Sequence, residues 1–89
     1  MTIIETARKV TTDKSAQLVR EHKKELRRYD VKPLFTGSHR GWFILDLFTA
    51  SAICAVADAI NQENLAKFQE LALPKVLKIT WSLVKTQKV

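Results

Sequence analysis

The segment between Leu47 and Ile60 constrains the fold most, because it leaves almost no polar face for water. Only three polar residues interrupt its run of apolar side chains. A helix with apolar residues on every side must be buried by its own chain or by a partner. Asp46 comes directly before the segment, and its carboxylate can accept hydrogen bonds from the free N–H groups of a first helical turn. The sequence therefore predicts a buried central helix over Asp46–Ile60.

Three other segments can supply helices that cover the central one. The first runs from residues 12–13, where either side chain can cap a helix, to residues 28–29. Residues 61–64 end the central helix and cap a short third helix. Pro74 suits the first turn of a fourth helix, where its missing N–H costs nothing. In that last segment the alternation of apolar residues over 79–83 leaves a strand open as the alternative.

The remaining segments are a connector before the central helix and the first ten residues. Residues 31–33 are expected to be extended, because a proline restricts the residue before it. Residues 37–41, Gly-Ser-His-Arg-Gly, are typical of a turn. The apolar residues on both sides of this turn leave a small β-hairpin open within residues 33–45. Residues 1–10 fit either a helix or an edge strand.

These elements predict an all-α fold. The chain has 89 residues, enough for one small domain with a modest core. It contains only two glycines and two prolines, and so few breakers favour helices over a many-turned β-fold. We expect a compact domain of three to four helices with the central helix buried, and the small β-hairpin before it as an open feature. Residues 1–10 and 86–89 are the candidates for frayed ends.

Composition narrows the compartment and excludes several classes of protein. The single cysteine excludes an intramolecular disulfide and a cysteine zinc cage, and it suits a reducing compartment such as the cytoplasm. The first residues lack the charged-then-apolar order of a secretion signal. The uncharged run between Asp46 and Asp58 is eleven residues long, whereas a membrane-spanning helix needs about 20. We therefore expect a soluble protein with no membrane contact.

The first predicted helix carries five basic residues on one side. At about 100° per residue they follow one another around roughly 140° of the helix surface; they are Arg20, Lys23, Lys24, Arg27 and Arg28. If this segment is a helix, Glu21 can form an ion pair with Lys24, and Glu25 with Arg28, because the members of each pair are three residues apart. The other three basic residues then form an unpaired centre.

The charge of the whole chain agrees with a contact to an acidic partner. The net charge is +6, and residues 1–40 hold ten Lys and Arg against five Asp and Glu. Arg40, in the glycine-flanked turn, can add an anion contact. A basic balance of this kind favours nucleic-acid phosphates or an acidic protein surface, and it does not choose between them.

The residues that could carry catalysis are few and scattered. Cys54 lies within the apolar segment, where burial silences a thiol. His22 and His39 are 17 positions apart with no clustered carboxylate, which makes a weak metal site. Asp46 and Asp58 are about 18 Å apart along one helix, too far for a paired acid–base site. The sequence therefore predicts a non-enzymatic binding protein with no catalytic, metal-binding or cofactor-binding residue.

Apolar surface offers an alternative function of another class. If the other helices do not cover the central one completely, apolar side chains remain exposed around Trp42, Phe43 and Trp81. Such a patch is typical of self-association. The alternative hypothesis is therefore a structural or adaptor protein that forms a homo-oligomer, with a homodimer as the simplest case.

One stretch resembles known proteins. Residues 41–53, Gly-Trp-Phe-Ile-Leu-Asp-Leu-Phe-Thr-Ala-Ser-Ala-Ile, with residues 59–68, Ala-Ile-Asn-Gln-Glu-Asn-Leu-Ala-Lys-Phe, look like parts of small uncharacterised bacteriophage proteins. The resemblance covers Gly41–Phe68, about a third of the chain, and contains no catalytic motif. It implies a short accessory protein that acts by binding a host or phage component, and no functional residue can be carried over from it.

Overall fold

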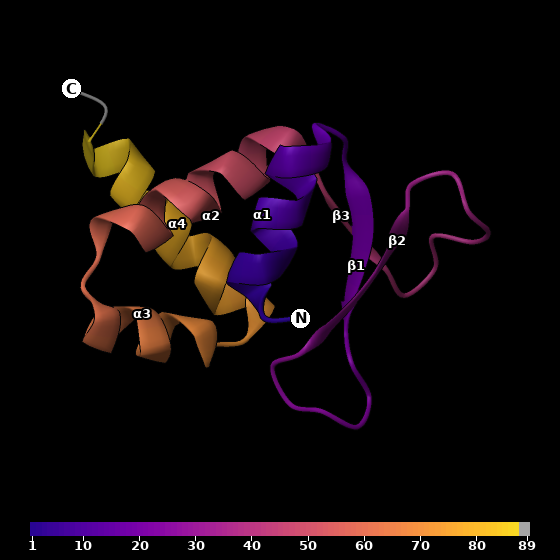
Figure 1. Ribbon diagram of the computed structural model, residues 1–89, viewed down its shortest axis with the longest axis horizontal. Helices are drawn as coiled ribbons and strands as arrows, with labels where there is room; N and C mark the ends of the chain where they lie inside the picture. The colour runs from indigo at the N-terminus through magenta and orange to yellow at the C-terminus, as the bar shows by residue number, and fades with distance from the viewer. Residues whose placement is uncertain (88–89) are drawn as a thin grey trace.

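Helices and a small sheet form the two sides of the molecule (Figure 1). The computed structural model describes residues 1–87. The elements follow the order α1 (Ile3–Asp13), β1 (Gln17–Glu21), β2 (Tyr29–Pro33), β3 (Phe43–Leu45), α2 (Leu47–Ala59), α3 (Gln62–Gln69) and α4 (Leu73–Gln87). Within this described part, four helices accompany a three-stranded antiparallel sheet. The fold is therefore α+β, and the prediction of an all-α domain is wrong.

The first helix lies earlier in the chain than the sequence predicted. Thr2 caps α1: its hydroxyl accepts a hydrogen bond from the Glu5 N–H, and the Glu5 carboxylate accepts one from the Thr2 N–H. At the other end Lys14 takes a left-handed conformation, with φ at 53°, and stops the helix. The residues after Lys14 are therefore free to form a strand instead of the helix predicted over 12–29.

Strand β1 lies in the middle of the sheet, in the order β2-β1-β3. It pairs antiparallel with both neighbours, so that Leu18 faces Lys32 on one side and Ile44 on the other. Sheet pairing explains why this segment is not a helix. As a helix it would bury only a narrow stripe, whereas in the centre of the sheet both Leu18 and Val19 are completely buried, although neighbouring side chains point to opposite faces.

The β-hairpin left open within residues 33–45 does not form, although both of its flanks contain strand residues. Residues 31–33 are extended, as expected, and they belong to an edge strand, where a proline does no harm. Residues 43–45 form β3, but β2 and β3 do not pair with each other. Each of them pairs with β1 instead. The hairpin in the structure joins β1 to β2 through residues 22–28.

The other helices agree with the sequence predictions in position. The Asp46 carboxylate caps α2 by accepting a hydrogen bond from the Thr49 N–H at 2.7 Å, and the Asn61 side chain caps α3. Pro74 lies in the first turn of α4, and no strand forms at 79–83. The fraying predicted at 86–89 concerns residues at the limit of the structure: α4 extends to Gln87, and 88–89 lie outside the described residues.

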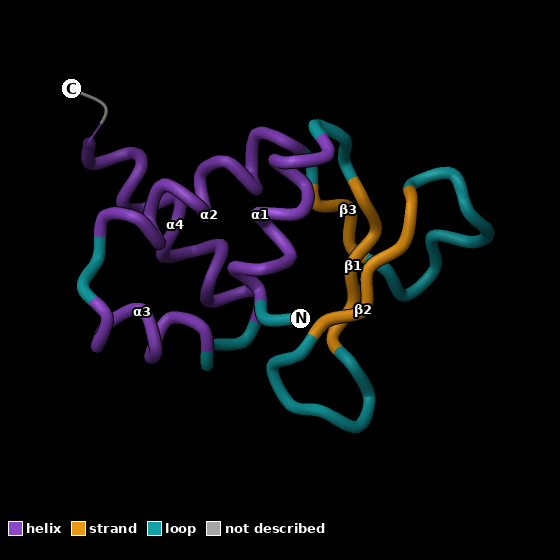
Figure 2. Tube along the Cα trace, viewed as in Figure 1, coloured by secondary structure: helices purple, strands orange, loops and turns teal. Residues whose placement is uncertain are grey.

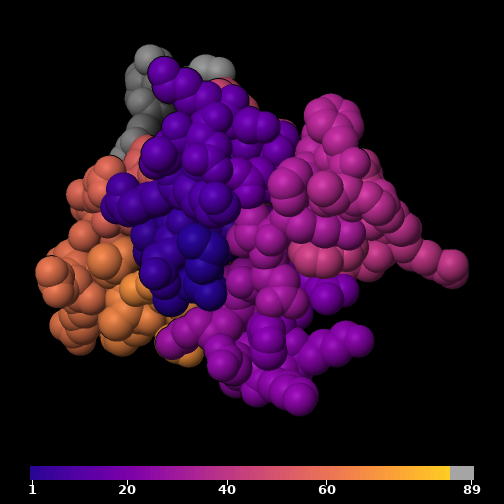
Figure 3. Space-filling model, turned by 45° about the vertical axis from the view of Figure 1, so that its right-hand side comes forward, coloured from indigo at the N-terminus to yellow at the C-terminus, as the bar shows by residue number. Residues whose placement is uncertain are grey.

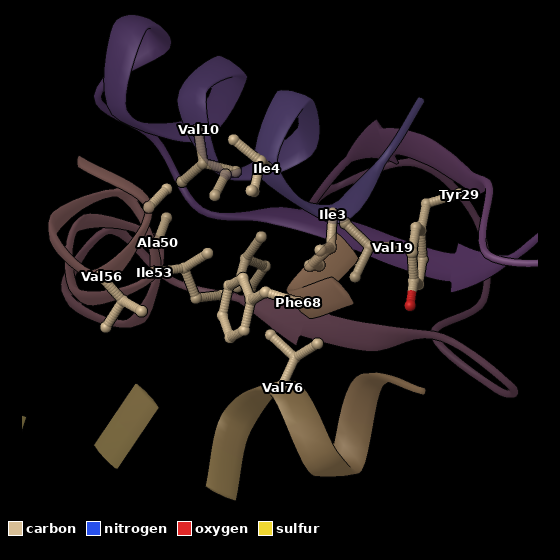
Figure 4. Packing of buried hydrophobic residues seen from close by; sticks show 13 residues of the cluster. Ile3, Ile4, Val10, Val19, Tyr29, Ala50, Ile53, Val56, Phe68 and Val76 are labelled. Carbon is tan, nitrogen blue, oxygen red and sulfur yellow. The ribbon is translucent and has the colours of Figure 1, made fainter. Parts of the chain in front are cut away.

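The core lies between the helices and the inner face of the sheet (Figure 4). The strands contribute Val19, Tyr29 and Leu45, all nearly or completely buried. Figure 4 shows Phe68 of α3 reaching in between Ile53 of α2 and Val76 of α4. Burial of about ten side chains of this kind, each contributing about 1.5–3 kcal/mol, is the main force that holds the two sides together.

Helix α2 is not buried on every side, which corrects the prediction of a fully buried central helix. One side packs against α1 and α4 through buried residues such as Ala50, Ile53 and Val56. The start of the helix is open to solvent, since Leu47 is 40% exposed and Phe48 is 72% exposed. The chain is too short to cover a helix all round, so an apolar strip remains on the surface.

Candidate functional site

Two loops on the sheet side of the molecule carry most of the predicted binding residues. Figure 2 shows them in teal, residues 22–28 below the sheet and residues 34–42 to its right. In the space-filling view both segments project from the body of the molecule (Figure 3). Residues 20–42 hold seven basic and three acidic residues, which accounts for four of the six net positive charges of the chain. The positive charge is thus concentrated at the sheet.

The loop of residues 22–28 is shaped by His22. Its ring nitrogen Nδ1 accepts hydrogen bonds from the N–H groups of Lys24 and Glu25, at 3.1 and 3.2 Å. The backbone N–H of His22 also donates to the Arg28 carbonyl at 2.6 Å, which closes the base of the loop. Because Nδ1 accepts, the proton of the neutral ring is on Nε2. The ring therefore acts as a cap that holds the backbone of Lys24 in place.

Lys23 and Lys24 are the free cations of this loop. Both are exposed, and neither side chain makes a hydrogen bond or ion pair within residues 1–87. The sequence predicted that Glu21 would pair with Lys24, but that pairing depends on a helix that does not form. In the structure Glu21 bonds to Arg27 instead. Lys24 is consequently available to a partner.

Arg20 and Arg27, predicted to be unpaired, are both engaged within the protein. Arg27 donates to the Glu21 carboxylate at 2.9 Å and to the Glu70 carbonyl at 2.7 Å. Glu70 is the C-cap of α3, where a cation also meets the negative end of the helix dipole. Arg20 pairs with Asp30 at 3.3 Å. These two arginines hold the loop and the strand in place, so the unpaired centre predicted from helical spacing is wrong for both of them; of its three residues, only Lys23 is without a partner in the described part of the chain.

Arg28 is half-buried and donates to the Arg27 carbonyl at 3.2 Å. It therefore also helps to hold the loop. Of the five residues predicted on one helix side, the structure places Arg20 on β1 and the other four in the 22–28 loop. The chain does bring them to one end of the molecule, but not as a helix face.

Trp42 joins the second loop to the outer face of the sheet. Its ring lies 4.3 Å from the guanidinium carbon of Arg20 and 4.5 Å from the Lys32 ammonium nitrogen. Each contact is a cation–π interaction. Leu18, which is paired with Lys32 and lies two residues before Arg20 on β1, is completely buried, although it is not part of the core cluster on the helix side. Trp42 is half-buried here, and so it is not the exposed contact residue predicted for self-association.

The loop of residues 34–42 is held by internal hydrogen bonds. The N–H and hydroxyl of Thr36 both donate to the Pro33 carbonyl, at 3.2 and 2.7 Å, and close a tight turn. A ring nitrogen of His39 lies 2.7 Å from the Leu34 carbonyl oxygen. The Lys32 ammonium donates to the Ser38 carbonyl. Gly37 and Gly41 supply the positive φ angles of 66° and 80° that the turns require.

Two side chains of this loop project outward. Arg40 is exposed, and its side chain has no partner in the described part of the chain. Phe35 is 93% exposed. The sequence predicted Arg40 as an anion contact, which its exposure allows. It did not single out Phe35, whose only signal was its place in a turn between Pro33 and Gly37.

A cleft of about 300 Å³ opens beside Phe35, between the end of α1 and the ends of β1 and β2. Lys9 and Gln17 both donate to the Asp13 carboxylate there, at 3.1 and 2.8 Å. The hydrogen bond from Lys9, and then that from Gln17, lowers the pKa of Asp13, so this carboxylate is charged and already paired. The lining residues are Lys9, Asp13, Ser15, Ala16, Gln17, Val31, Lys32, Pro33, Leu34 and Phe35.

An apolar surface at the start of α2 is separate from the basic loops. The rings of Phe48 and Trp81 stack with their centroids 5.4 Å apart. Phe48 is 72% exposed and Trp81 is 36% exposed. Phe43, which was predicted together with Trp42 and Trp81 to form an exposed apolar surface, is 38% exposed. Surface aromatic pairs of this type are enriched where proteins meet.

An apolar groove of about 270 Å³ lies between α2, α3 and α4. Its lining residues are Val56, Ile60, Asn64, Lys67, Phe68, Leu71, Ile79 and Leu83.

The residues considered for catalysis are not grouped. His22 and His39 lie in different loops, and Cys54 is on α2. Within residues 1–87, no group of three or more histidine, cysteine, aspartate or glutamate side chains could hold a metal ion.

The helices also give one result about membranes. Among those that the structure describes, none combines the length and the apolar character that spanning a bilayer requires.

Comparison with known proteins found no matching family model, no matching curated protein and no matching solved structure. The resemblance of Gly41–Phe68 to small bacteriophage proteins stays a prediction.

Proposed function

We propose that this protein is a non-enzymatic binding protein that contacts an acidic partner through the basic loops at its sheet. The contact residues are the free cations Lys23, Lys24 and Arg40. The partner is a nucleic acid or an acidic protein surface. The observation that carries the proposal is the position of these three side chains. Each is exposed, on a loop that the fold holds in place, and without an acidic partner in the described part of the chain.

The engaged arginines support the same proposal in another way. Arg20 and Arg27 hold the loops by ion pairs with Asp30 and Glu21. A partner therefore meets Lys23 and Lys24 on a backbone that is already ordered, which lowers the entropy lost on binding. Contacts of this kind to phosphates or carboxylates attract an acidic partner over a distance and depend on salt.

Charge reversal at free residues tests the proposal. The variant Lys23→Glu/Lys24→Glu changes the net charge by four and leaves the internal ion pairs intact. The control variant Lys75→Glu/Lys78→Glu makes the same change in charge at two exposed residues of α4. Fluorescence anisotropy would measure binding to a labelled oligonucleotide and to a labelled acidic peptide. The proposal expects the first variant to lose binding far more than the control, and equal losses would contradict it.

A second candidate function, self-association, is favoured by the exposed stack of Phe48 and Trp81. In the sequence, Phe48 lies within the uncharged run between Asp46 and Asp58. Two copies can therefore meet at the surface of Phe48 and Trp81 without using the basic loops. Light scattering in high salt would detect a fixed oligomer, and Phe48→Ser would dissociate it. Leu26→Ser, at an exposed residue of the basic loop, is the control. A monomer at high protein concentration would refute this candidate.

A further inference from the structure

Phe35 has no evident role in the fold. Its side chain is 93% exposed, more than that of any other large hydrophobic residue described. Mobility of the loop does not account for this position, because the turn at Pro33–Thr36 is closed by two hydrogen bonds to one carbonyl. A third contact, between His39 and the Leu34 carbonyl, fixes the residue next to Phe35. The loop therefore fixes the backbone on both sides of Phe35, and the ring lies out in solvent.

The surroundings of the ring indicate what it can bind. Phe35 and Leu34 line one side of the cleft of about 300 Å³, and Lys9 and Lys32 also lie along it. The one carboxylate in the cleft, that of Asp13, is paired with Lys9 and Gln17. Arg40, five residues after Phe35, adds a free cation on the same loop. Lys9 is paired with Asp13, and the Lys32 ammonium donates to the Ser38 carbonyl and lies over the Trp42 ring, whereas the Arg40 side chain has no partner within residues 1–87. An exposed ring on a loop with a free cation, beside a cleft whose lining has a net positive charge, suits a ligand that is both planar and negatively charged.

We propose that the acidic partner is a single-stranded nucleic acid, one base of which stacks on Phe35 beside this cleft. This inference rests on the proposed function. Every nucleobase has a π-face that can stack on an aromatic side chain, and the phosphates next to it are attracted by nearby cations. In a duplex both faces of a base are covered by its neighbours, so only an unpaired base can use the ring. An acidic peptide would use the cations and leave Phe35 without a contact.

Substitution of Phe35 separates stacking from charge. Phe35→Leu keeps an apolar side chain and removes the π-face, whereas Phe35→Trp keeps a π-face. Leu26→Ala, at a residue 74% exposed on the other loop, is a matched truncation that should have no effect. The probes are a fluorescein-labelled oligothymidylate, a duplex of the same length and a labelled polyglutamate, each measured by anisotropy in low salt. Circular dichroism would check that all variants fold.

We expect the full chain to bind oligothymidylate more tightly than the duplex. Stacking contributes about 1–3 kcal/mol per base, so Phe35→Leu should weaken oligothymidylate binding roughly 5- to 150-fold. Phe35→Trp should bind like the unsubstituted protein, and duplex binding should not change.

Three results would overturn the inference. Equal oligothymidylate binding by Phe35→Leu and the unsubstituted protein would refute stacking and leave the proposed function standing. Binding of polyglutamate alone would replace nucleic acid with an acidic protein and would also leave the proposed function standing. If none of the three probes binds, the inference and the proposed function both fail.

Discussion

The buried hydroxyl of Tyr29 allows a prediction whose sign is unusual for a core substitution. The side chain packs in the core, 4% exposed, and its hydroxyl has no hydrogen-bond partner within the described residues. Burial of a hydroxyl without a partner costs about 1–3 kcal/mol. Tyr29→Phe removes the hydroxyl and keeps the ring in its place between the sheet and the helices. We therefore expect the substitution to raise the free energy of unfolding by about 1 kcal/mol or more, instead of lowering it.

Thermal and denaturant unfolding followed by circular dichroism would measure this change. In a domain of this size, 1 kcal/mol raises Tm by about 4–8 °C. Thr80→Val is a second test of the same reasoning, because the Thr80 hydroxyl is also buried without a partner and valine has nearly the same shape. A loss of stability of about 1 kcal/mol in Tyr29→Phe would refute the reasoning, since it would mean that the hydroxyl makes a bond.

The same residue gives a dependence on pH. Burial raises the pKa of Tyr29, the nearby Glu21 carboxylate raises it further, and Arg27 opposes them. The unfolded chain therefore loses this proton more readily, above about pH 10. The contribution of the neutral Tyr29 side chain to the free energy of unfolding is complete below about pH 10. It is lost as the pH rises through the raised pKa of the folded state. Because Tyr29 is the only tyrosine, tyrosinate absorbance would report its titration alone. The Tyr29→Phe variant has no phenol at this position, so its free energy of unfolding should not show this part of the loss at alkaline pH.

Four further substitutions test the fold around the site. Asp46→Ala should cost about 1 kcal/mol, because it removes the cap of α2, whereas Asp58→Ala, at an exposed ion pair, should cost less than about 0.5 kcal/mol in the same denaturation assay. Ile53→Ala should cost about 2–5 kcal/mol by leaving a cavity in the core, and a loss below 1 kcal/mol would contradict the packing. Trp42→Leu should cost about 1–2 kcal/mol in urea unfolding, because it removes two cation–π contacts, and no loss would show that those contacts contribute nothing.

Local signals predicted the second half of the fold. Asp46 before an apolar run, Asn61 after it and Pro74 further on each act within one helical turn, so the sequence places α2, α3 and α4 within a residue or two. The same kind of signal was available at the start of the chain. Thr2 and Glu5 have the spacing of a capping box, which predicts a helix that begins at residue 3.

The sheet could not be predicted in this way, because its order depends on contacts far apart in the sequence. Leu18 and Val19 are adjacent and buried on opposite faces, a pattern that local periodicity does not separate from a helix. The burial of Leu18 depends on β3 and on the loop that carries Trp42, more than 20 residues later.

The same long-range pairing changed the site. Lys24 became free and Arg27 became engaged because Glu21 lies on a strand beside the loop, where it reaches Arg27 and not Lys24. The exposure of Phe35 depends on the turn between two strands of this sheet. The residue types at the site were therefore visible in the sequence, but their pairing was not.

The salt dependence of oligonucleotide binding tests the central claim most directly. For a single strand, each phosphate contact contributes about −0.7 to the slope of log K against log salt concentration. Three free cations, Lys23, Lys24 and Arg40, should therefore give the unsubstituted protein a slope of about −2. The variant that reverses all three should bind weakly and lose most of that slope. A flat salt response in the unsubstituted protein, or an equal slope in the variant, would contradict the account.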